Sequence, residues 1–128
     1  MARDARDEAR LRLSALAEDP NAPWAPARRL EEDAALLGRL LAAAAGHQQS
    51  RGQVPDVAPD EVGAALSLFE DMRHQLDRLE TQVIIEARRR DMDWRQVARF
   101  QGLNSSQAAS QRYQRLMTRL EEIRQGVR

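Results

Sequence analysis

The stretch Asp93–Arg119, DWRQVARFQGLNSSQAASQRYQRLMTR, decides the fold of this chain. Asp93 precedes a short run with helical apolar spacing that begins at Trp94, so its side chain is the expected N-cap. Gly102 predicts the end of that helix, because glycine adopts the left-handed conformation beyond a helix C-terminus without a Cβ penalty. The stretch therefore begins with a short helix and a tight turn.

A second, longer helix is predicted after the turn. Asn104, Ser105 and Ser106 offer three capping side chains in a row, and apolar residues then recur at helical spacing as far as Ile123. Two helices crossing over so short a turn need a small side chain where their backbones approach, and Ala98 supplies it. This is the order of parts in a helix-turn-helix, although a helical hairpin that only packs is the alternative.

The run Arg88–Leu116 also carries a family resemblance. It contains W-x-x-V-A, G-L, S-S-Q-A-A and R-Y-x-x-L in that order, and it resembles the helix-turn-helix of sigma-factor region 4 and of many small actinobacterial DNA-binding proteins. The resemblance covers only this run and implies that the second helix enters the DNA major groove. One position departs from the pattern: the residue before Gly102 is usually apolar, but here it is Gln101, and Phe100 supplies the bulk.

Basic residues concentrate in the same part of the chain. The whole chain has 20 basic residues, all arginine, and 20 acids, so its formal net charge is zero. From Ala87 to Arg119, eight arginines stand against Asp91 and Asp93, a net charge of +6, whereas residues 1–86 carry −6. A basic segment in a neutral chain predicts a phosphate-binding surface, and a solvated charged face is the alternative.

The predicted DNA-binding set lies on the second helix and on nearby arginines. On the helix it comprises Ser105, Ser106, Gln107, Ser110, Gln111 and Gln114. Of these, Ser106, Gln107, Ser110 and Gln111 are expected to face base edges, which serine and glutamine side chains can bond in the major groove. The predicted phosphate ligands are Arg88, Arg89, Arg95, Arg112 and Arg115.

A stripe of apolar residues predicts one long helix, from about Pro59 to Arg90. At 1.5 Å per residue this helix would be about 48 Å long, and it cannot bury its stripe alone. Either residues 27–45 or a second chain must cover it, and we expect a homodimer through the long helix. The stripe comprises Val62, Leu66, Phe69, Met72, Leu76, Leu79, Val83 and Ala87.

The N-terminal part predicts two further helices. Residues 3–18 have amphipathic spacing, and a second helix runs from Pro26 or Ala27 to about Ala45. The expected organisation is an N-terminal helical segment at 1–46, a linker rich in Gly, Gln and Pro at 47–58, and a DNA-binding domain at 59–128.

Composition excludes several classes of function. Without cysteine there are no disulfides, thiolate zinc sites or cysteine nucleophiles. The longest apolar run, Leu40–Ala45, is far short of the roughly 20 residues that span a bilayer, so we expect a cytoplasmic, nucleoid-associated protein without membrane contact. His47 falls in the linker, His74 is expected in a surface ion pair, and no catalytic motif is present. We therefore expect no enzyme activity, metal, cofactor or small-molecule ligand.

The expected protein is all-α: a long helix plus a C-terminal helix-turn-helix, with an N-terminal helical appendage. Its expected function is transcription regulation, and its expected partner is double-stranded DNA. Two alternatives remain open. The chain could be a helical protein–protein interaction module without DNA binding, or a nonspecific chromatin-associated protein that uses the same arginines without reading bases.

Overall fold

The computed structural model describes residues 4–17 and 24–126, and every regular element within them is a helix. The helices are α1 (Ala5–Ser14), α2 (Ala25–Gln49), α3 (Pro59–Arg89), α4 (Trp94–Gln101) and α5 (Ser106–Arg124). The predicted all-α class is confirmed. None of the described helices combines the length and the apolar character that crossing a bilayer requires.

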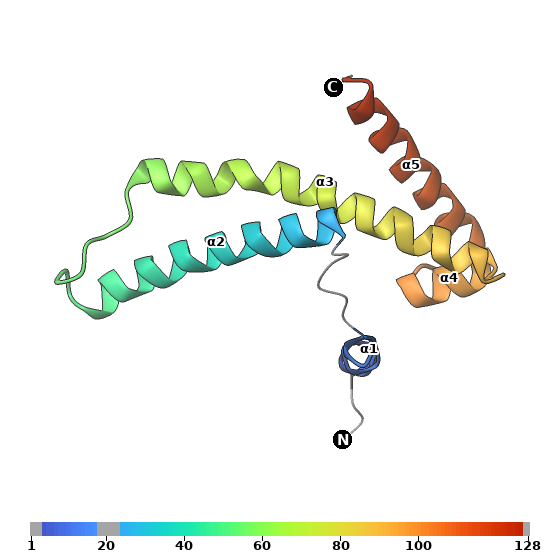
Figure 1. The fold of residues 1–128 in the computed structure, drawn as a ribbon, viewed down its shortest axis with the longest axis horizontal. Coiled ribbons are helices and arrows are strands. Elements are labelled where there is room, and N and C mark those ends of the chain that lie inside the picture. Colours follow the sequence, from blue (N-terminus) through green and yellow to red (C-terminus); the bar gives the residue numbers. More distant parts are fainter. Residues whose placement is uncertain (1–3, 18–23, 127–128) are drawn as a thin grey trace.

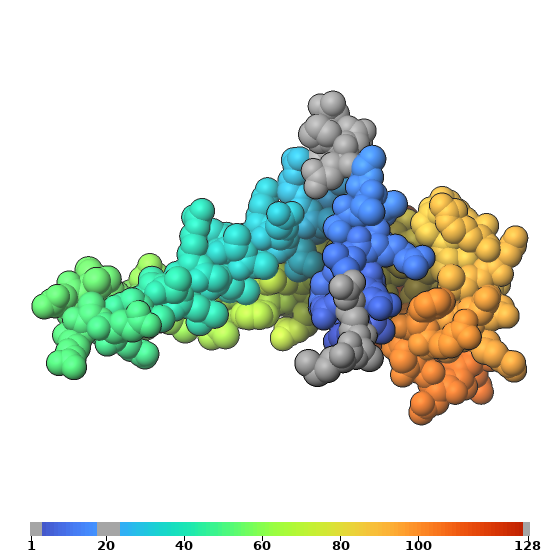
Figure 2. All heavy atoms as spheres, turned by 90° about the horizontal axis from the view of Figure 1, so that it is seen from below, coloured from blue at the N-terminus to red at the C-terminus, as the bar shows by residue number. Residues whose placement is uncertain are grey.

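The molecule is elongated, with its turns at opposite ends. α2 and α3 run antiparallel side by side, α3 continues past the start of α2, and α4 and α5 pack around its far end (Figure 1). The space-filling view shows the α2–α3 connection at one end and the α3–α4–α5 junction at the other (Figure 2). α1 has no buried residue.

α3 has the predicted length. Its 31 residues begin at Pro59, and the carboxylate of Glu61 in the first turn accepts a hydrogen bond from the Ala58 N–H at 2.7 Å. After the helix ends, Asp91 takes the left-handed conformation with φ 62°, which aspartate tolerates better than most residues. The chain reverses there, and Met92 N–H donates to the Ala87 carbonyl at 3.1 Å.

α2 is longer than predicted. Gly46 was expected to lie beyond the helix, but α2 continues to Gln49, because one glycine inside a helix costs only about 0.5–1 kcal/mol. His47 therefore lies in the last turn of α2, not in a linker beginning at residue 47, and its Nδ1 lies 2.6 Å from the Val54 carbonyl oxygen. The connection between α2 and α3 is correspondingly shorter, residues 50–58.

The best-buried apolar side chains lie where α3, α4 and α5 meet. Val97 and Ala98 of α4 and Ala109 of α5 form a buried cluster. Ile84 of α3 and Leu116 of α5 are each only 3% exposed. Partly buried residues surround the cluster, namely Ala87, Met92, Trp94 and Leu103. This core holds α4 and α5 against the C-terminal end of α3.

Candidate nucleic-acid interface

α4 begins and ends at the predicted residues. Asp93 Oδ1 accepts from the Gln96 backbone N–H at 2.8 Å, and Gln96 Oε1 accepts from the Asp93 N–H at 2.9 Å, which is a reciprocal capping box. Gly102 has φ 74° and occupies the left-handed C-cap. Leu103 N–H then donates to the Ala98 carbonyl at 2.8 Å. These bonds set the direction in which the chain leaves α4.

α5 starts at a serine cap and crosses α4 at two alanines. Ser105 Oγ accepts from the Ala108 N–H at 3.0 Å, so Ser105 is the cap among the three candidate residues. Ala98 is 3% exposed and Ala109 is fully buried. Because both side chains stop at Cβ, the two helices can approach closely at this point.

The N-terminal turns of α5 present a polar face to solvent. Gln107, Gln111 and Gln114 are all exposed, and their spacing of four and three residues places them on one side of the helix. Ser105 and Ser106 are also exposed, whereas Ser110 is half-buried. All six predicted residues on the helix are thus at least partly accessible.

Three of the predicted phosphate ligands have no carboxylate partner among the described residues: Arg88, Arg95 and Arg115. Arg88 lies over the Trp94 ring, 4.9 Å from its centroid, and its Nη1 donates to the Met92 carbonyl at 2.9 Å. Arg95 is exposed on the first turn of α4. Arg88 and Arg95 therefore both lie near the start of α4.

The other two predicted ligands bind carboxylates of α3. Arg89 pairs with Glu86 at 2.8 Å on the exposed surface, where such pairs are weak. Arg112 makes a bidentate contact in which Nε and Nη2 donate to the two oxygens of Glu80, at 2.5 and 2.7 Å. These hydrogen bonds raise the pKa of Arg112 above its ordinary value. Arg112 is thus engaged inside the chain and does not present an unpaired guanidinium to a phosphate.

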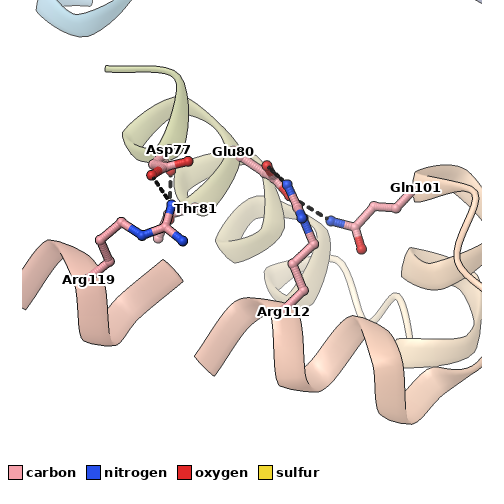
Figure 3. A network of polar contacts seen from close by, with 6 residues as sticks. All are labelled: Asp77, Glu80, Thr81, Gln101, Arg112 and Arg119. Atoms are coloured by element: carbon pink, nitrogen blue, oxygen red, sulfur yellow. Dashed lines mark hydrogen bonds and ion pairs between the residues drawn. The ribbon is translucent and has the colours of Figure 1, made fainter. Parts of the chain in front are cut away.

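Glu80 joins three helices (Figure 3). Besides Arg112 of α5, its carboxylate accepts from Gln101 Nε2 of α4 at 3.1 Å. Three residues earlier on α3, Asp77 accepts from Arg119 Nη1 of α5 at 2.6 Å. The two acids therefore fix how α4 and α5 sit on α3.

Gln101 has a physical reason to be polar. An apolar side chain before Gly102 would leave one bond to Glu80 unmade, whereas Gln101 supplies it. Spacing along the chain does not predict this network, because its members lie on three different helices. One signal was present: Glu80 falls between Leu76 and Val83 at a spacing of four and three, so it is an acid at an apolar position of the stripe.

The prediction of a surface ion pair for His74 is wrong. His74 is only partly exposed, and its Nδ1 is buried without a hydrogen-bond partner among the described residues. Two of the acids near it in the sequence bond elsewhere: Asp71 pairs with Arg29 of α2 at 3.0 Å, and Asp77 pairs with Arg119. Both of these arginines lie on other helices.

The chain matches no family model, and no curated protein or solved structure is similar to it. The resemblance to sigma-factor region 4 therefore stays a prediction from the residues quoted above. Within the described residues, histidine, aspartate and glutamate do not gather in groups of three that could hold a metal ion.

Replacing Glu80 with alanine is expected to destabilise the fold by about 1–3 kcal/mol, because Arg112 and Gln101 both lose their partner in a half-buried setting. Glu86→Ala is the matched control on the same helix, since its arginine pair is exposed, and it should cost less than about 1 kcal/mol. Urea denaturation followed by circular dichroism measures both. Equal midpoints for the two variants would show that the Glu80 network contributes nothing beyond a surface pair.

Proposed function

We propose that α4 and α5 form a helix-turn-helix that binds double-stranded DNA, with the start of α5 in the major groove, and that the chain is a transcription regulator. The observation that carries this proposal is the chemistry of residues 94–119, which hold five arginines and no acid. On the same segment, the first turns of α5 expose serine and glutamine side chains. Base edges and phosphates are bound by these residue types.

The exposed polar face favours this proposal over a hairpin that only packs. α4 and α5 already bury Val97, Ala98, Ala109 and Leu116 toward the junction with α3. Packing therefore accounts for these four apolar side chains. It gives no role to the glutamines on the other side of α5, whereas glutamine amides can pair with adenine in the major groove.

The proposed roles divide the site into three groups. Gln107 and Gln111 lie in the first two turns of α5, where a recognition helix meets base edges. Arg88, Arg95 and Arg115 bond phosphates and orient the protein on the duplex. Arg112, which the sequence placed among the phosphate ligands, instead acts as a positioning residue through Glu80.

Binding to random duplex is expected to weaken steeply with salt. With three phosphate contacts per protomer, the slope of log K against log salt should be about −3 per protomer, at about −0.9 per contact. Arg115→Ala should flatten this slope by about one unit, because it removes one phosphate contact and no contact within the fold. Fluorescence anisotropy between 50 and 200 mM salt, the range over which such contacts weaken strongly, measures the slope.

Arg124→Ala is the control, since Arg124 lies at the other end of α5 and pairs with Glu121 at 2.6 Å. It should leave the slope unchanged. Arg112→Ala should lower stability instead of changing the slope. A complex that does not respond to salt, or one in which Arg115→Ala and Arg124→Ala behave alike, would contradict the assignment of the arginines.

A further inference from the structure

α3 leaves a row of apolar side chains uncovered, which we call the α3 seam. It consists of Val62, Leu66, Phe69, Leu76 and Val83, which are between 38% and 67% exposed. α2 does not cover the seam. α2 contacts α3 on another side, as at Asp71, which pairs with Arg29 of α2 at 3.0 Å and is rotated about 200° from Phe69 of the seam. The intervals along the seam are four, three, seven and seven residues, which are the spacings of three and four that separate core positions in helix pairs, and their sum.

The C-terminal half of the seam forms one wall of an open apolar groove of about 650 Å³. The other wall comes from α4 and the turn before it, where Met92 and Phe100 line the groove and Phe100 is 74% exposed. Among the described residues, those that line this groove begin at Leu76, so the N-terminal half of the seam lies outside it. One half of the seam is thus a groove, and the other half is a row of projecting apolar side chains.

We infer that a second copy of this chain occupies the seam, with the two α3 helices antiparallel. In this pairing Val83 faces the partner's Leu66, and Ala87 faces the partner's Val62. Each groove then receives the projecting half of the other copy's seam, and the two-fold symmetry fills both grooves at once. A self-complementary surface of this kind needs no additional partner.

Charge selects the antiparallel direction. Two charged residues, Arg73 and Glu80, interrupt the seam at core spacing. A parallel pair in register would place Arg73 against the partner's Arg73, which is unfavourable, and Glu80, already paired with Arg112, against the partner's Glu80. In the antiparallel pair Glu80 instead faces the partner's Phe69. Within one chain Arg73 lies over the Phe69 ring, 5.8 Å from its centroid. Because Phe69 faces the partner's Glu80, Arg73 comes next to that glutamate.

This pairing has a consequence for DNA that rests on the proposed function. In this pairing the partner's Ala87 lies opposite Val62, which is 25 residues from Ala87 of the same chain. The C-terminal ends of the two α3 helices would therefore be about 38 Å apart along the pair, at 1.5 Å per residue. Asp77, which holds α5, follows Leu76 of the seam and is rotated about 100° from it. Both α5 helices therefore lie on one side of the α3 pair, as two half-sites on one face of a duplex require.

Single-cysteine variants test the pairing, because the chain has no cysteine of its own. Leu66→Cys and Val83→Cys should form a mixed disulfide when the two proteins are combined under mild oxidation. Neither should cross-link alone, because like positions lie about 26 Å apart along the pair and a disulfide needs Cα atoms within about 7 Å. The control mixture combines Leu66→Cys with Gln82→Cys in place of Val83→Cys. Because Gln82 is exposed on another side of α3, this mixture should not cross-link.

Light scattering of the unmutated chain should give twice the 14.5 kDa chain mass, and Leu76→Glu should halve it while circular dichroism stays helical. A 14.5 kDa monomer means that another segment, such as α1, covers the seam, and it overturns the inference. Cross-linking of either variant alone means parallel pairing and also overturns it. These readouts need no DNA. A monomer that still binds duplex leaves the proposed function standing, whereas a mixed disulfide without duplex binding supports only the pairing.

Discussion

Replacing Leu116 with alanine is expected to lower the free energy of unfolding by about 2–5 kcal/mol, the range for removing a large aliphatic side chain from a packed core. Leu116 is 3% exposed on α5, and Ile84 is equally buried on α3. The two helices are in contact. Leu116 thus lies in the apolar part of the junction that carries the proposed DNA-binding face.

Met117→Ala is the matched control, because Met117 is the next residue on the same helix but is 41% exposed. Its truncation should cost less than about 1 kcal/mol, since little buried surface is lost. Urea titrations followed by the helical circular dichroism signal measure both variants, and the midpoint should fall without a large change in the m-value. Similar midpoints would mean that α5 does not derive its position from packing on α3.

The helix ends around α4 and α5 could be predicted because local chemistry determines them. Asp93 and Ser105 each accept a hydrogen bond from a backbone N–H three residues further along, and Gly102 adopts the left-handed conformation that ends α4. The same holds for the start of α3 at Pro59. Such interactions can be read from a single stretch of sequence without knowing which segments meet.

The polar network could not be predicted in the same way. Glu80 bonds to Gln101 and Arg112, which are 21 and 32 residues away, and Asp77 bonds to Arg119 at a distance of 42 residues. Sequence spacing along one helix says nothing about such partners. The charge of Arg112 and its place along the second helix therefore predict a phosphate ligand, although its partner in the fold is Glu80.

The segment that packs on the apolar stripe of α3 could be predicted only in part. The sequence showed that α3 needs a cover but not whether residues 27–45 or a second chain supplies it. The structure places α2 along one strip of α3 and leaves Leu66, Leu76 and Val83 more than half exposed. α2 and a second chain can thus both pack on α3, because the apolar face of α3 is wider than a single neighbouring helix can bury.

Gln107→Ala and Gln111→Ala are each expected to weaken binding to the preferred DNA site by about 1–3 kcal/mol, or about 5- to 150-fold. Both residues lie on one exposed face of α5, and each would leave one base without its hydrogen bonds. Binding to random duplex should barely change, because phosphate contacts supply most of it. Gln82→Ala on α3 is the control and should change neither affinity.

The ratio of the dissociation constants for random and selected duplex, measured with the full chain at one salt concentration, tests the central claim most directly. The selected duplex would come from a random library enriched by the unmutated protein. The expected ratio is at least about 10³, and it should fall about 5- to 150-fold in each of Gln107→Ala and Gln111→Ala. A ratio near one, or a high ratio that both glutamine variants keep, would contradict base reading by α5.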